Sequence, residues 1–205
     1  MAAIVNSTRR DETEKPMQLE KTAVRYAIDS KLSRFTVRAF ASGVLSAFGH
    51  NPTIAVHDFA GEVQSMPDEV QGASLRLVAK AESLETVDDI SDKDRREIQR
   101  QMHEEVLESS QYPEIVYECN SILGNKIRHG QYAVALNGEL TLHGVTRGQT
   151  IMARGVLTDD TLRAFGDFSL LQTDYDIKLV SALGGALRVK DELKVSFDIV
   201  ARKQA

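Results

Sequence analysis

The sequence predicts a mainly β protein, an antiparallel lipocalin-like β-barrel with one amphipathic α-helix packed against it. Three observations indicate this class: apolar and polar residues alternate along most of the chain after Val24, only one segment has helical spacing, and the turns between strands are short. Alternation gives each strand one apolar face. The short turns leave no room for the helical crossovers that parallel strands need.

The N-terminal end is predicted to lie outside the barrel. Residues 1–22 are polar and aperiodic, so we expect a mobile tail followed by one barrel domain over 23–205. No apolar stretch is long enough for a signal-peptide core or a membrane span, so we expect a cytoplasmic protein. Acidic residues outnumber basic ones by 30 to 25, which argues against a nucleic-acid partner. The single cysteine, Cys119, excludes an internal disulfide and is expected in the core.

The strands are predicted from segments in which the period is two. A closed barrel is preferred over an open sandwich because closure removes the exposed edges of long strands. An eight-stranded barrel is just wide enough for one small ligand. The alternating segments are 34–41, 74–83, 114–122, 131–144, 149–158, 161–173 and 192–203.

The apolar faces of these strands are the candidate walls of a ligand channel. They would line a channel, pack under the helix, or fill the interior with their own side chains, and the sequence leaves these alternatives open. The residues that we expect to line an apolar channel are Phe35, Val37, Leu75, Leu77, Ile115, Tyr117, Tyr132, Val134, Leu136, Leu140, Leu142, Phe168, Leu170, Val195 and Phe197.

One segment has the spacing of a helix. Ile98, Met102 and Val106 lie four residues apart, with charged residues on the remaining faces. Ser91 is the expected N-cap. We therefore predict one helix over about 92–109, packed against the sheet by a narrow apolar stripe.

Three histidines are candidates for polar chemistry. His50 lies in the turn Gly-His-Asn-Pro, His57 in an alternating run, and His143 at the end of a long strand. We expect His50 and His143 at the barrel rim, where they would orient a ligand headgroup; the alternative for His50 is a turn residue that bonds its own loop. No metal site is expected, because neither H-E-x-x-H nor paired-cysteine spacing occurs, and no Gly-x-Ser-x-Gly elbow indicates a catalytic nucleophile.

Several segments, in order, carry a family resemblance. They include YAIDSKLSRFTVRAF, FGHNPTIAVHDFAGEV, LNGELTLHGVTRGQTI and VKDELKVSFDIVA. Over residues 24–202 the chain resembles the YceI-like family of polyisoprenoid-binding, lipocalin-like proteins. The resemblance implies an antiparallel barrel whose apolar channel takes an isoprenoid chain, such as a polyprenol or a quinone tail, and a carrier rather than an enzyme. The chain departs from the family at Leu32-Ser33, where His-Ser is frequent, and at Gly148-Gln149, where Pro-Val is usual.

Three functional hypotheses follow. The first is a non-catalytic binding or carrier protein for an isoprenoid or other long-chain apolar lipid, with no other cofactor. The second is a metal-dependent enzyme that uses His50, His57 and His143. The third is an interaction scaffold with a filled barrel, whose helix face recruits a partner or forms a homodimer.

Overall fold

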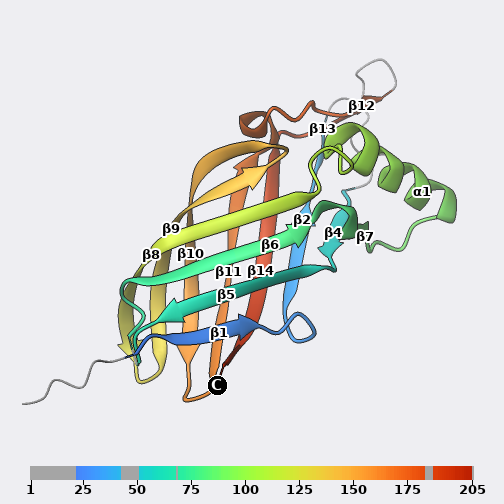
Figure 1. Cartoon of the computed structure of the whole chain (residues 1–205). Coiled ribbons are helices and arrows are strands. Elements are labelled where there is room, and N and C mark those ends of the chain that lie inside the picture. Colours follow the sequence, from blue (N-terminus) through green and yellow to red (C-terminus); the bar gives the residue numbers. More distant parts are fainter. Residues whose placement is uncertain (1–21, 43–50, 68, 183–186, 205) are drawn as a thin grey trace, which may run out of the picture.

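The chain folds into one antiparallel sheet that closes on itself (Figure 1). The structure is a computed structural model that describes residues 22–42, 51–67, 69–182 and 187–204. Neighbouring strands pair in the order β1–β5–β6–β8–β9–β10–β11–β14, and β14 pairs back onto β1. The predicted fold class is confirmed. The predicted tail, except Thr22, lies outside the described residues. The barrel strands are β1 (Val24–Ile28), β5 (Phe59–Ser65), β6 (Ala73–Lys80), β8 (Glu114–Arg128), β9 (Gln131–Leu142), β10 (Val145–Leu157), β11 (Thr161–Leu171) and β14 (Glu192–Lys203).

The longest strands show directly why alternation predicts a barrel wall. On β9, Val134, Leu136 and Leu140 are buried, whereas Asn137 and Glu139 are exposed. In a closed barrel the buried face of each strand lines the interior while the other face stays hydrated. The period of two therefore describes the wall of the barrel.

The hairpin between β9 and β10 is a two-residue turn. His143 and Gly144 have φ angles of 51° and 73°, and Leu142 pairs with Val145. Turns with both central residues in the left-handed region match the twist of antiparallel strands. A Cβ on Gly144 would lie 2.6 Å from the ring of Tyr112, so glycine also admits this ring. The predicted position of His143 at the end of a long strand is confirmed.

At one end of the barrel the wall continues as a branch of short strands. These are β2 (Arg34–Arg38), β4 (Thr53–Val56) and β7 (Leu84–Thr86). β2 pairs with β14, β4 pairs with β2, and β7 pairs with β4. Within the described part of the chain β7 has no strand on its other side. The branch therefore ends in an edge strand. The remaining short strands, β3 (Ala41–Ser42), β12 (Ser181–Ala182) and β13 (Leu187–Val189), form a separate small sheet.

The helical segment follows β7 in the chain and lies beside that edge (Figure 1). Helix α1 (Asp92–Gln101) continues into the π-helical turn η3 (Met102–Val106). The Ser91 side chain accepts a hydrogen bond from the backbone N–H of Asp94, so the predicted N-cap is confirmed. The predicted end at residue 109 is wrong: the helix stops three residues earlier, and Glu108 has a φ of 43°, which no right-handed helix accommodates.

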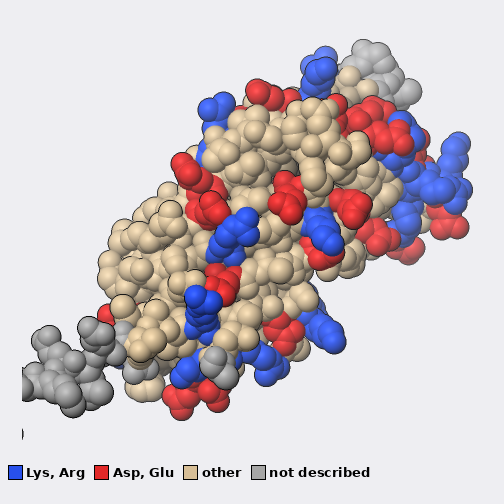
Figure 2. Space-filling model, viewed as in Figure 1, with Lys and Arg blue, Asp and Glu red and all other residues tan. Residues whose placement is uncertain are grey.

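The apolar stripe of the helix buries less than its pattern predicts. Met102 is buried, whereas Ile98 and Val106 are only half-buried and α1 itself contains no buried residue. Figure 2 shows Lys, Arg, Asp and Glu crowded on the outside of this helix. The stripe packs at the end of the barrel beside β7 rather than along the length of its wall. Among the described residues, no helix has the length and apolar composition needed to cross a bilayer.

Candidate ligand-binding cavity

The barrel encloses a cavity of about 220 Å³. Its walls come from every strand of the ring, and one end is bordered by Val106 and Leu107, at the end of the helical segment. For comparison, a dry apolar cavity of about 150 Å³ holds a benzene molecule. The interior is therefore hollow, in contrast to the filled barrel of the third hypothesis.

Every residue predicted from the alternation to line an apolar channel lies in the wall of this cavity. The set runs from Phe35 on β2 to Phe197 on β14. Strand closure thus decides the alternative that the sequence left open, because these faces point inward. That they bind a ligand stays a prediction.

The prediction missed two kinds of lining residue. The first kind shares a face with predicted residues, such as Ala79 and Ile199, and could have been included from the alternation alone. The second kind comes from outside the strands, such as Leu107 and Ile177. No periodicity marks this second kind, because only the closure of the barrel end brings them together.

The polar side chains in the wall direct their hydrogen-bonding atoms away from the cavity. The Tyr117 hydroxyl lies 2.9 and 3.0 Å from the backbone carbonyl oxygens of Leu136 and Gln149, which share its one proton. Burial raises the pKa of Tyr117, so the hydroxyl stays a neutral donor. Gln172, which also lines the cavity, donates its side-chain N–H to the carbonyl of Lys190 at 2.8 Å. The surface offered to a ligand is consequently almost wholly apolar.

A glycine makes the Tyr117 arrangement possible. A Cβ on Gly138 would lie 2.7 Å from the Tyr117 hydroxyl oxygen and closer still to the carbonyl of Glu118. Real Cβ contacts do not reach such distances, since interiors are close-packed. Gly138 therefore leaves the space through which the tyrosine reaches the backbone of β9 and β10.

The two rim histidines have different outcomes. His50 lies outside the described residues. His143 is only 11% exposed at its side chain and does not line the cavity. Its Nε2 lies 2.8 Å from a carboxylate oxygen of Glu108, and its Nδ1 lies 3.1 Å from the carbonyl of Tyr175. His143 thus joins the segment after the helix to the far side of the barrel end, and its predicted contact with a headgroup stays a prediction.

A substitution separates these two roles of His143. We expect His143→Asn to lower the free energy of unfolding by about 1–3 kcal/mol, because both partners lose a hydrogen bond, while asparagine tolerates the left-handed backbone. Affinity for an apolar probe should change less than about threefold. Urea unfolding and a fluorescence titration measure the two effects. Weaker binding at unchanged stability would instead support the headgroup role.

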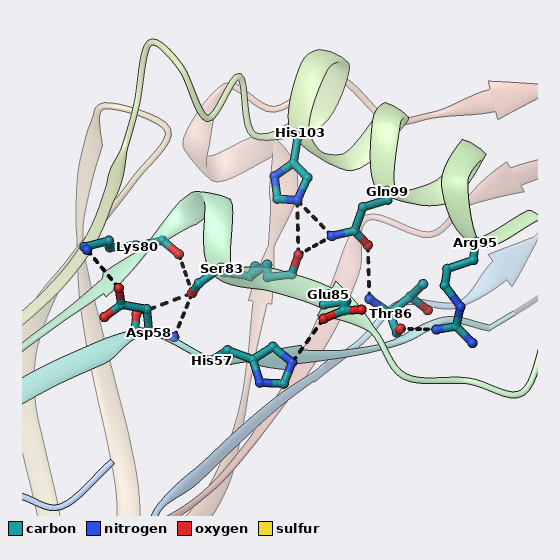
Figure 3. A network of polar contacts seen from close by, with 10 residues as sticks. His57, Asp58, Lys80, Ser83, Glu85, Thr86, Arg95, Gln99 and His103 are labelled. Atoms are coloured by element: carbon teal, nitrogen blue, oxygen red, sulfur yellow. Dashed lines mark hydrogen bonds and ion pairs between the residues drawn. The ribbon is translucent and has the colours of Figure 1, made fainter. Parts of the chain in front are cut away.

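Among the described residues, the predicted histidines are not gathered into a metal centre. His57 is exposed and lies 3.6 Å from a carboxylate oxygen of Glu85 (Figure 3), whereas His143 contacts Glu108. In the described ranges, no three His, Cys, Asp or Glu residues are grouped closely enough to hold a metal ion. Cys119 is fully buried, as expected for a small core residue, and its thiol lies 3.5 Å from the carbonyl of Asn137.

Comparison with known proteins shows which family and which solved structures this chain is similar to. The chain matches the model of the YceI-like domain over residues 26–201. Burkholderia cenocepacia BcnA has 15% identity and a TM-score of 0.64, with 84% of this chain and 98% of that chain covered. A polyisoprenoid binding domain from Saccharophagus degradans has 14% identity and a TM-score of 0.62, with 87% and 98% covered. The YCEI protein of Campylobacter jejuni has 14% identity and a TM-score of 0.55, with 77% and 88% covered.

At these identities the solved structures establish a shared fold and no more. A search of curated proteins found no match in sequence. The family model, by contrast, covers most of the chain, from Tyr26 within β1 to Ala201 within β14. Together with the closed antiparallel barrel and its apolar interior, this match shows that the chain belongs to the YceI-like domain family.

Proposed function

We propose that this protein binds an isoprenoid or another long-chain apolar lipid inside the barrel, non-covalently and without turnover. The observation that carries the proposal is the cavity of about 220 Å³, whose walls are aliphatic and aromatic. Burial of apolar surface stabilises a complex by about 25 cal/mol per Å² and has no directional requirement. A flexible hydrocarbon chain is the ligand that such a wall suits best.

The chemistry of the wall supports binding rather than catalysis. Tyr117 and Gln172 satisfy backbone carbonyls with their donor groups, so the ligand inside needs no polar group of its own. A headgroup would lie at the rim, where His50 is predicted. The description of the Saccharophagus degradans relative as a polyisoprenoid binding domain favours an isoprenoid chain, including a quinone tail, among apolar ligands.

Native mass spectrometry of the protein purified from its own cells tests this proposal. We expect a bound species whose mass, after solvent extraction, identifies a lipid with a long hydrocarbon chain. Extraction should also lower the melting temperature, because a ligand that binds only the folded state stabilises it. Absence of any bound lipid, together with no thermal shift when a polyprenol or a quinone is added, would refute the proposal.

Two further predictions accompany the proposal. We propose that the protein is cytoplasmic and that it forms a homodimer. Fractionation of the source cells tests the first. Size-exclusion chromatography with light scattering tests the second, where a mass of about one chain across the concentration range would contradict a dimer.

A further inference from the structure

We propose that α1 and η3 form a lid over one end of the cavity, and that Arg95, Gln99 and His103 latch this lid to the edge of β7. The lid would open and close to control the passage of the ligand. This inference rests on the proposed function, since it concerns access to the same cavity.

The lid lies at the end of the closed ring where the branch of short strands stops. At this end, the branch of short strands ends at β7, while β8 begins beside the end of β6, where Lys80 pairs with Glu114. No pairing joins β7 to β8 among the described strands. The helical segment connects these two strands in the chain. It therefore borders the end of the barrel at which β7 and β8 are not paired.

The side chain of Gln99 binds the free edge of β7 as a neighbouring strand would (Figure 3). Its Nε2 donates to the carbonyl of Leu84 at 2.6 Å, and its Oε1 accepts from the N–H of Thr86 at 3.3 Å. A carbonyl and an N–H of one strand thus meet one side-chain amide. This satisfies the backbone groups that an edge strand otherwise leaves unpaired.

Two further residues on the same helical face extend the latch. Arg95 donates to the carbonyls of Thr86 and Asp88, at 2.6 and 2.7 Å. His103 Nε2 lies 3.1 Å from the carbonyl oxygen of Leu84 on β7 and 3.0 Å from the Gln99 amide nitrogen, and its Nδ1 lies 2.9 Å from the Ser109 hydroxyl. A proton on Nε2 allows the ring to donate to Leu84, and a proton on Nδ1 allows it to accept from Gln99 and donate to Ser109. The latch residues are spaced four apart, as neighbours on one face of a helix are.

Apolar contacts hold the lid less firmly than the strands hold each other. α1 contains no buried residue, and burial in the helical segment is limited to Met102 and, just after it, Leu107. Val106 and Leu107 line the cavity, as does Leu84 on β7 beside the latch. The lid is thus attached by polar side chains on its outer part and touches the cavity with its last turn.

This division of contacts is suited to opening. When the outer part of the lid lifts, water can replace each side-chain partner of the β7 edge, so this part opens at less cost than the last turn, where Met102 and Leu107 pack in the core. Segments with few buried apolar contacts and half-exposed hydrogen bonds are those that open locally while the rest of a fold persists. The volume of about 220 Å³ is below the 300–1,000 Å³ usual for ligand pockets, which also favours an end that moves.

Gln99→Ala tests the latch, and Gln101→Ala is the matched control. Gln101 lies on the same helix, and its side chain donates only to Glu97. Delipidated protein would be mixed with the uncharged fluorescent probe N-phenyl-1-naphthylamine in a stopped-flow instrument. We expect Gln99→Ala to raise the association and dissociation rates about tenfold each, as loss of two hydrogen bonds implies. The dissociation constant should change less than about threefold, and Gln101→Ala should leave both rates unchanged.

Hydrogen exchange gives a second readout that needs no ligand. In Gln99→Ala, we expect the amides of Leu107 and Ser109, which bond to the helix carbonyls of Met102 and His103, to exchange about tenfold faster. Amides of the barrel strand β9 should be unaffected. Unchanged rates of both probe binding and exchange in a folded Gln99→Ala protein would overturn the lid.

The two measurements, probe binding and hydrogen exchange, also distinguish this inference from the proposed function. A probe that fails to bind even the unsubstituted protein contradicts an apolar binding cavity, while faster exchange at Leu107 still supports the latch. A probe that binds with rates insensitive to Gln99 supports the cavity and contradicts the lid. If Gln99→Ala does not fold by circular dichroism, Arg95→Ala, which keeps the Gln99 contacts, replaces it with the same expected direction.

Discussion

Replacing Ala164 by phenylalanine should abolish most of the binding of long apolar chains. Ala164 lines the cavity on β11 and pairs with Gly155 on β10. At Gly155 an added Cβ would meet other side chains at 3.9 Å, an ordinary van der Waals distance, so the wall beside Ala164 is not overpacked. A phenyl group here excludes roughly four methylenes of ligand at about 0.8 kcal/mol each, or about 200-fold in affinity.

The matched control for Ala164→Phe is Ala135→Phe. Ala135 is on β9 between the lining residues Val134 and Leu136, on the outer face of the wall. We expect this variant to bind the probe as the unsubstituted protein does. Fluorescence titration with N-phenyl-1-naphthylamine compares the two. Equal weakening by both substitutions would mean that the effect is structural, and unchanged binding by Ala164→Phe would place the ligand outside the cavity.

Gly138→Ala should destabilise the protein strongly. The new methyl group would meet the Tyr117 side chain and the carbonyl of Glu118, and displacement of the tyrosine would break its hydrogen bonds to the backbone of β9 and β10. Overpacking of a core costs about 1–3 kcal/mol, and each lost hydrogen bond about 0.5–1.5 kcal/mol. We expect the free energy of unfolding to fall by about 2–5 kcal/mol and the melting temperature by roughly 10 °C.

Gly148→Ala is the control for this substitution. Gly148 is exposed on β10, and an added Cβ would meet nothing within 4 Å. We expect its free energy of unfolding to change by less than about 1 kcal/mol, with a small gain because alanine restricts the unfolded chain. Thermal and urea unfolding of both variants measure the difference. Similar stabilities for the two variants would show that the Tyr117 contact contributes little.

The faces of the strands could be predicted because they follow from a local rule. In any strand, residues two apart point to the same side, so the set on β9 from Tyr132 to Leu142 could be named without knowing its neighbours. The N-cap at Ser91 is also local, since its side chain bonds an N–H three residues away. The end of the helix is predicted less accurately. A glutamate gives no indication that its backbone adopts the left-handed conformation, as that of Glu108 does.

The lid contacts escaped prediction for the opposite reason. Arg95, Gln99 and His103 lie on one helical face, but polar residues four apart on a helix usually face water. Their partners on the barrel are backbone groups of β7 and of Asp88 just after it, and the backbone carries no residue-specific signal. These side chains become part of the barrel end because, among the described strands, none lies on the other side of β7.

By itself, the sequence determined the antiparallel β class, the apolar face of each strand and the resemblance to the YceI-like family, since these depend on spacing along the chain. The tertiary structure alone decided that those faces enclose a cavity, that Gly138 admits the Tyr117 ring, and that His143 joins Glu108 to Tyr175. The physical reason is the closure of the ring between β1 and β14. It sets the register of strands that are far apart in sequence, and only this register fixes which side chains meet.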